Sequence, residues 1–154
     1  MLPNPDIDPV LFRLGPIAIR WYGLMYVCGL TAAFFMIKAR AAKHQVALSL
    51  DNLHDLILYA AVGVILGGRL GYILFYNLPY YIESPVKLLA VWEGGMSFHG
   101  GLLGVIVAVG VFCRRKGRTF YAISDLAAPA VPIGLGLGRL GNFINGELYG
   151  RPTD

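Results

Sequence analysis

Four long apolar stretches alternate with short polar stretches along the chain. Charges are almost absent from residues 21–37, 56–82, 94–113 and 119–138, where only Arg69 and Asp125 interrupt the apolar pattern. A helix needs about 20 residues to cross the hydrocarbon core of a bilayer. Because lipid offers no partner for backbone N–H and C=O groups, such segments must cross as helices. The pattern predicts an all-α fold, a polytopic membrane helix bundle with about four transmembrane helices in a single domain over residues 1–154.

Composition and charge support this interpretation and add an orientation. Residues are 56% hydrophobic and only 14% charged, whereas a soluble domain carries about 25% charge. The segments 38–43 and 114–118 hold seven of the 13 Lys and Arg residues. Basic loops remain in the cytoplasm, so the N-terminus and residues 83–96 are expected outside. The net charge of +4 therefore indicates topology and contact with membrane lipids, and not nucleic-acid binding.

Glycine and proline suggest where the helices approach one another and where they break. Small residues let membrane helices pack closely, which explains Gly67, Gly71 and Gly104. Other glycines flank polar groups and are expected to leave room for a ligand, namely Gly100, Gly101, Gly138 and Gly141. Pro129 and Pro132 should kink or break the fourth helix. Residues 1–20 carry four prolines and two aspartates without a basic n-region, so we do not expect a secretory signal peptide.

Arg69 lies within the second apolar stretch and Arg139 directly follows the fourth, and each is part of a tetrapeptide Gly-Arg-Leu-Gly, at residues 68–71 and 138–141. An arginine near the middle of a membrane helix costs about 2.5–3.5 kcal/mol on insertion scales. Arg69 and Arg139 could reach the outer interface or pair with Glu93 or Glu147. Alternatively, their planar guanidinium groups could hold a lipid phosphate through paired hydrogen bonds.

Other polar groups are expected at the same outer level. His99 is either an interfacial side chain or a general base, because an imidazole titrates near neutral pH. Tyr22 is either part of an interfacial aromatic belt or a hydrogen-bonding partner at the depth of His99. Three further residues either form the polar collar of a helix end or hold the hydroxyl groups of a lipid headgroup: Asn142, Asn145 and Glu147.

Four motifs carry a resemblance to a known family. They are WYGLMY at 21–26, GGRLGYILFYN at 67–77, GGMSFHGGL at 94–102 and GRLGNFINGELYGR at 138–151. In order and in expected topology they resemble bacterial prolipoprotein diacylglyceryl transferases. The resemblance implies an inner-membrane enzyme that moves the diacylglyceryl group of phosphatidylglycerol to the lipobox cysteine thiol of a prolipoprotein signal peptide. A thioether forms, glycerol phosphate leaves, and no metal or cofactor is needed.

The resemblance also implies roles for particular residues. Catalytic roles are expected for His99, Tyr22, Asn142 and Glu147. Substrate-binding roles are expected for Arg139, Asn142 and Gly150. Asn145 and Arg69 are expected to bind substrate as well, on the grounds of their own chemistry given above and not of the resemblance. Family members continue beyond residue 154 with more helices, an outer head region and another functional arginine, so the chain resembles an N-terminal fragment.

Two other functional classes fit the residues. Arg69 and Arg139 could line a small anion transporter, or the chain could be a structural membrane subunit. The clustering of the polar residues at one face, without a path through the membrane, favours the enzyme.

Overall fold

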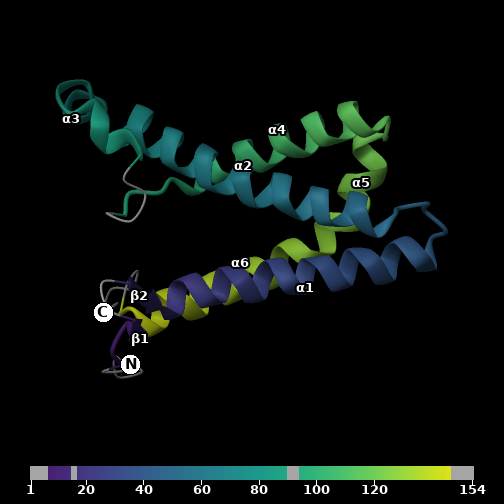
Figure 1. Cartoon of the computed structure of the whole chain (residues 1–154), viewed down its shortest axis with the longest axis horizontal. Coiled ribbons are helices and arrows are strands. Elements are labelled where there is room, and N and C mark those ends of the chain that lie inside the picture. Colours follow the sequence, from purple (N-terminus) through teal and green to yellow (C-terminus); the bar gives the residue numbers. More distant parts are fainter. Residues whose placement is uncertain (1–6, 15–16, 90–93, 147–154) are drawn as a thin grey trace, which may run out of the picture. The chain divides into compact units, whose positions relative to one another are not determined.

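Helices dominate the computed structural model, which describes residues 7–14, 17–89 and 94–146 (Figure 1). Four helical segments are long and apolar enough to cross a membrane: Trp21–Lys43, Leu50–Tyr76, Phe98–Lys116 and Phe120–Ile144. Many of their large apolar side chains are exposed, including Val27, Leu58 and Val107 at 60% or more. Lipid is the solvent in which such surfaces are stable, so the predicted all-α membrane fold is confirmed.

Local capping explains where the long helices begin and end. Helix α1 (Trp21–Lys43) passes through the predicted basic loop, and His44 is its C-terminal cap residue. Helix α2 (Leu50–Tyr76) begins six residues before the predicted start because the Ser49 side chain accepts the N–H of Asn52 at 3.2 Å. Helix α4 (Phe98–Lys116) is capped by Ser97 and ends at Gly117, whose φ of 62° suits glycine.

The fourth crossing segment is interrupted at the predicted prolines. Helix α5 (Phe120–Ala127) leads into the 3₁₀ turn η3 (Ala128–Ala130), and helix α6 (Val131–Ile144) follows. Pro129 and Pro132 lack the N–H groups that a continuous helix needs at these positions. The predicted break ahead of the polar motif is therefore confirmed.

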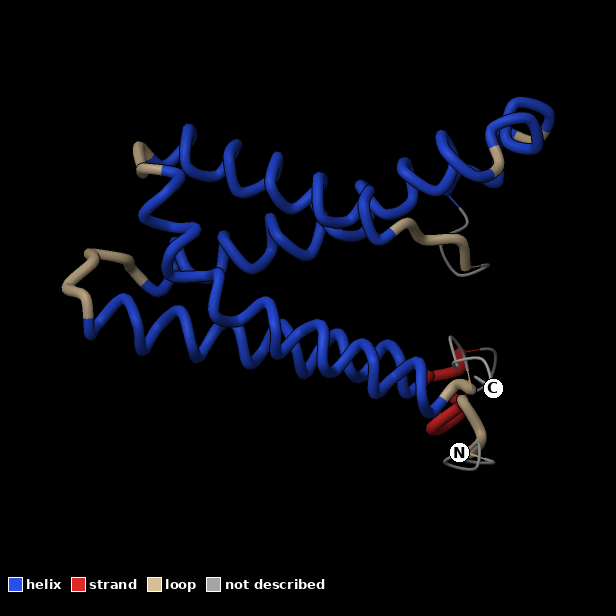
Figure 2. Tube along the Cα trace, turned by 180° about the vertical axis from the view of Figure 1, so that it is seen from behind, coloured by secondary structure: helices blue, strands red, loops and turns tan. Residues whose placement is uncertain are grey.

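Shorter elements complete the fold. Strands β1 (Val10–Leu14) and β2 (Ile17–Arg20) form an antiparallel hairpin that leads directly into α1. Figure 2 shows these two strands in red, next to the start of α1. The sequence patterns did not predict them. Beyond α2, helix α3 (Leu78–Glu83) and the 3₁₀ turn η1 (Pro85–Leu89) replace the continuous helix that was expected to residue 82.

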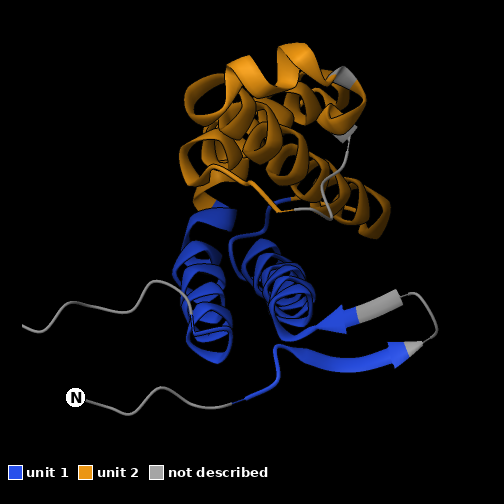
Figure 3. Ribbon diagram, turned by 90° about the vertical axis from the view of Figure 1, so that its left-hand side faces the viewer, with its two compact units in different colours: residues 1–46, 126–154 blue, residues 47–125 orange. Residues whose placement is uncertain are grey.

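The chain forms two compact units (Figure 3). Unit 1 comprises residues 1–46 and 126–154, and unit 2 comprises residues 47–125. In unit 1, α1 and α6 run side by side; in unit 2, α2 and α4 do the same (Figure 1). Each unit is thus built on an antiparallel helix pair, within what the sequence predicts to be a single membrane domain.

Glycines form the contact between α2 and α4. A Cβ atom built on Gly67 would lie 2.7 Å from the Cα of Gly104, and one built on Gly71 would lie 2.7 Å from the Cα of Gly100. Real Cβ atoms do not approach so closely, so the two backbones are in direct contact. The close approach predicted for Gly67, Gly71 and Gly104 is confirmed. The ligand space predicted at Gly100 is wrong, because the backbone of α2 occupies it.

This contact leads to a stability prediction. Gly104→Ala should destabilise the folded protein by about 1–3 kcal/mol, because the new methyl group forces α2 and α4 apart. Gly110→Ala is the matched control on the same helix, since no atom lies within 4 Å of its Cβ position. Thermal unfolding in detergent micelles would compare the two variants. Equal unfolding temperatures for both would contradict the proposed role of the contact.

Candidate active site

The polar residues singled out in the sequence fall into two groups, one in each unit. Unit 1 holds Tyr22, Arg139, Asn142 and Asn145, whereas unit 2 holds Arg69 and His99. Glu147 and Gly150 lie outside the described residues. In unit 1 the group lies near the start of α1 and the end of α6, and in unit 2 it lies at the start of α4 and the part of α2 beside it.

In unit 1, helix α6 presents the arginine and an asparagine on one face. Arg139 is exposed and Asn142 is half-buried, and α6 remains helical as far as Ile144. Side chains three residues apart share a helix face, so these two groups point to the same side. Asn145 follows as the C-terminal cap residue. A guanidinium and an amide side by side can donate to a phosphate and to a neighbouring hydroxyl group at once.

Tyr22 reaches the same end of α6 from the first turn of α1. A Cβ atom built on Gly141 would lie 2.8 Å from Cδ2 of Tyr22, so the missing side chain at Gly141 makes room for the tyrosine ring. The ligand space predicted at Gly141 is therefore wrong, whereas Gly138 has no atom within 4 Å of its Cβ position. The Tyr22 hydroxyl lies 3.5 Å from that of Tyr26. Sequence analysis missed Tyr26, although its spacing of four residues from Tyr22 places both on one face.

In unit 2, His99 occupies the first turn of α4. Its side chain is exposed, and its ring meets the Phe98 ring edge-on with centroids 5.5 Å apart. Two bonds fix the start of this helix: the Ser97 side chain accepts the N–H of Gly100 at 3.2 Å, and the Ser97 N–H donates to Gly68 at 2.9 Å. The imidazole is thus attached to a well-defined turn and is exposed.

Arg69 is buried, with only 4% of its surface exposed. Its Nη2 donates to the carbonyl of Lys87 at 2.6 Å and its Nε to that of Leu88 at 3.1 Å. Its Nη1 donates to the carbonyls of Gly94 at 2.5 Å and Gly95 at 3.4 Å. These bonds to backbone carbonyls indicate a structural role, and the phosphate contact expected for Arg69 stays a prediction.

Three neighbours of Arg69 were also missed in the sequence. The Tyr81 ring is buried, and its centroid lies 5.1 Å from the guanidinium carbon, within range of a cation–π interaction. Gly94 and Gly95 have φ angles of 85° and 78°, which favour glycine. The paired glycines at 94–95 were the available signal for a special backbone conformation.

The fold and these groups define a multi-pass membrane protein with candidate site residues at the ends of its helix pairs. A family model described as prolipoprotein diacylglyceryl transferase matches residues 9–154. The chain therefore belongs to the prolipoprotein diacylglyceryl transferase family. This relationship does not favour an anion transporter or a purely structural subunit.

Comparison with individual relatives supports the same family membership. The chain is 63% identical over 150 residues to the phosphatidylglycerol–prolipoprotein diacylglyceryl transferase of Geobacter sulfurreducens, covering 97% of this chain and 58% of the relative. It is 54% identical over 154 residues to proteins of the same name from Ectopseudomonas mendocina and Legionella pneumophila (strain Paris), covering 58% and 60% of those relatives. The chain thus spans about three-fifths of the length of the curated relatives it matches.

Proposed function

We propose that the chain is part of an enzyme that transfers the diacylglyceryl group of phosphatidylglycerol to the lipobox cysteine of a prolipoprotein. The observation that carries this proposal is the end of α6, where Arg139 and Asn142 share a face beside Tyr22. This arrangement matches the needs of a lipid headgroup that carries one phosphate and free hydroxyl groups. It occurs in a chain with family similarity along almost its whole length.

The proposed reaction is a substitution at a glycerol carbon. The cysteine sulfur forms a bond to the diacylglyceryl carbon while the bond from that carbon to the phosphate oxygen breaks, and glycerol phosphate leaves. His99 accepts the thiol proton, because a thiolate is a much better nucleophile than a thiol. Arg139 holds the phosphate and stabilises its charge as it leaves.

The remaining residues orient the substrates in this proposal. Asn142 and Asn145 bind the glycerol hydroxyl groups, and Glu147 and Gly150 complete the same segment. The Tyr22 hydroxyl donates a hydrogen bond to the headgroup. Because both substrates reside in the bilayer, a site at the helix ends receives them without extracting either one from the membrane.

The activity can be tested directly with full-length protein that carries this sequence. A lipobox peptide and phosphatidylglycerol would be incubated with the protein in detergent or vesicles. Mass spectrometry should detect the peptide with one added diacylglyceryl group, together with free glycerol phosphate. An unmodified peptide, under conditions where a known relative modifies it, would contradict the proposed function.

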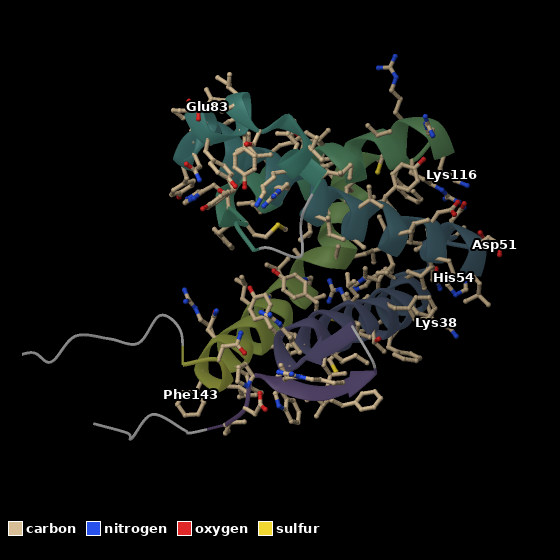
Figure 4. The ribbon with its side chains drawn as sticks, turned by 60° about the vertical axis from the view of Figure 1, so that its left-hand side comes forward. Lys38, Asp51, His54, Glu83, Lys116 and Phe143 are labelled. Atoms are coloured by element: carbon tan, nitrogen blue, oxygen red, sulfur yellow. The ribbon has the colours of Figure 1, made fainter. Side chains whose placement is uncertain are left out.

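We also propose an orientation in the bacterial inner membrane, with the N-terminus and residues 83–96 outside. Lys116 pairs with Asp55 at 2.6 Å at one end of unit 2, and Glu83 lies at the other (Figure 4). The basic residues 114–118 favour the cytoplasm for the Lys116 end. The site residues, at the opposite helix ends, then face the periplasm.

Cysteine labelling tests this orientation. In a background with Cys28→Ala and Cys113→Ala, an impermeant maleimide added to intact cells should label Glu83→Cys and spare Lys116→Cys. Permeabilised cells provide the control, since both positions should then react. Labelling of Lys116→Cys alone in intact cells would reverse the proposed topology.

A further inference from the structure

Arg69 joins two chain segments that lie on either side of residues 90–93. These segments, here called the connector ends, are residues 87–88 after α3 and residues 94–97 before α4. The guanidinium donates to carbonyls of both: Lys87 and Leu88 on one side, Gly94 and Gly95 on the other. The planar guanidinium has five N–H donors that diverge in a fixed fork, so it can hold both ends at once. Burial makes these bonds costly to lose, since each free donor would remain without water.

The second connector end continues directly into the turn that bears His99. Gly68, the residue before Arg69, accepts the N–H of Ser97 at 2.9 Å. Two adjacent residues of α2 therefore hold this end, one through its side chain and the other through its carbonyl. Ser97 in turn caps the N–H of Gly100, and His99 lies between Ser97 and Gly100 in the sequence.

From these contacts we infer that Arg69 is a positioning residue: it fixes the connector ends and, through the Ser97 cap, the helix turn that presents His99. Release of the guanidinium would let residues 94–97 move and would weaken the cap of α4. The interior of α4 would stay in place, because the glycine contacts with α2 hold it. The effect of Arg69 on activity rests on the proposed transferase function, whereas its effect on the connector ends does not.

Arg69→Gln in full-length protein tests this inference. We expect kcat to fall about 10- to 100-fold, because small displacements of a reacting group have effects of this size. The KM for phosphatidylglycerol should stay within about twofold of wild type. Hydrogen exchange at the Ser97 and Gly100 amides should accelerate at least about tenfold, while residues 104–113 keep wild-type protection.

Each other outcome overturns the inference. A KM that rises in parallel with the loss of activity, with unchanged exchange, would assign Arg69 to the lipid phosphate. Faster exchange throughout α2 and α4 would show a general stability role. Wild-type hydrogen exchange together with a wild-type kcat would show that the hydrogen bonds of Arg69 do not position the turn that bears His99. If wild-type protein transfers no lipid, the proposed function fails, and the exchange data alone still decide the role of Arg69.

A pair of glycine variants tests the same contact while Arg69 remains in place. A Cβ atom on Gly95 would lie 3.1 Å from Nη1 of Arg69 and 2.6 Å from the Tyr72 ring, whereas one on Gly94 would meet no atom within 4 Å. Both glycines have positive φ angles, so alanine is strained at either position. Gly95→Ala should reproduce the local exchange and kcat changes of Arg69→Gln, and Gly94→Ala should show a smaller change. Equal effects of the two glycine variants would overturn the inference. If the Arg69→Gln protein does not accumulate in cells, the comparison of the glycine variants alone tests whether Arg69 is a positioning residue.

Discussion

Arg139→Ala is expected to yield folded, membrane-inserted protein that has lost about 10³-fold in kcat/KM and binds phosphatidylglycerol weakly. The arginine is exposed at the end of α6, so its removal leaves no buried cavity and should not unfold the helix pair. In the proposed reaction, Arg139 holds a phosphate whose negative charge grows as the bond between its oxygen and the glycerol carbon breaks. Removing one preorganised donor to such a charge commonly costs about 10²–10³-fold, and the lost permanent charge adds to that.

Conservative substitutions separate the phosphate role from a structural ion pair. Lysine keeps the charge but lacks the planar fork, so Arg139→Lys should fold normally and still lose about 10²-fold in activity. If Arg139 instead served as an ion-pair partner of Glu147, lysine would restore function, and Glu147→Gln would lower stability as much as Arg139→Ala does. Arg114→Ala, which removes an exposed arginine from the last turn of α4, is the control for loss of surface charge. Wild-type lipid binding and turnover in Arg139→Ala would refute the phosphate role.

The membrane helices could be predicted from sequence because their signal is long and repeated. Each span needs only an apolar stretch of sufficient length, which composition reveals directly. The predicted ends of the helices were less accurate than the helices themselves, because a helix end depends on a single local contact. Ser49 starts α2 early through one side-chain bond, and α1 continues through basic residues that have good helix propensity. The hairpin at residues 10–20 has short strands. Their pattern of apolar and polar residues does not stand out from the rest of this apolar chain.

The two Gly-Arg-Leu-Gly segments show why the site was harder to predict. Their local sequences are identical, and both arginines were expected to meet a phosphate, an acidic partner or the outer interface. Arg69 is instead enclosed by backbone carbonyls from residues 18 to 26 positions away, whereas Arg139 is exposed. Only tertiary contacts distinguish the two environments, and no local pattern records them. The same holds for Gly100 and Gly141, where another part of the chain fills the space that a bare backbone leaves.

His99→Ala should lower kcat about 10²–10⁴-fold, the usual contribution of a positioned general base. The exposed ring on the first turn of α4 can reach a thiol without rearrangement of the helix. In the variant no imidazole takes the thiol proton, so activity should depend on the fraction of peptide already present as thiolate. A more acidic nucleophile, such as a selenocysteine peptide, should therefore recover part of the lost rate in His99→Ala.

Two further variants distinguish a role of His99 as general base from a role in packing. His54→Ala removes another exposed histidine of unit 2, at the end that carries Asp51 and Lys116 (Figure 4), and should leave transfer near the wild-type rate. His99→Gln preserves hydrogen bonding and approximate size but cannot accept a proton at neutral pH. If His99 is the base, glutamine should be almost as damaging as alanine, and the selenocysteine peptide should rescue both variants. Near-normal turnover in His99→Gln would instead leave His99 with a hydrogen-bonding role and require another group to take the thiol proton.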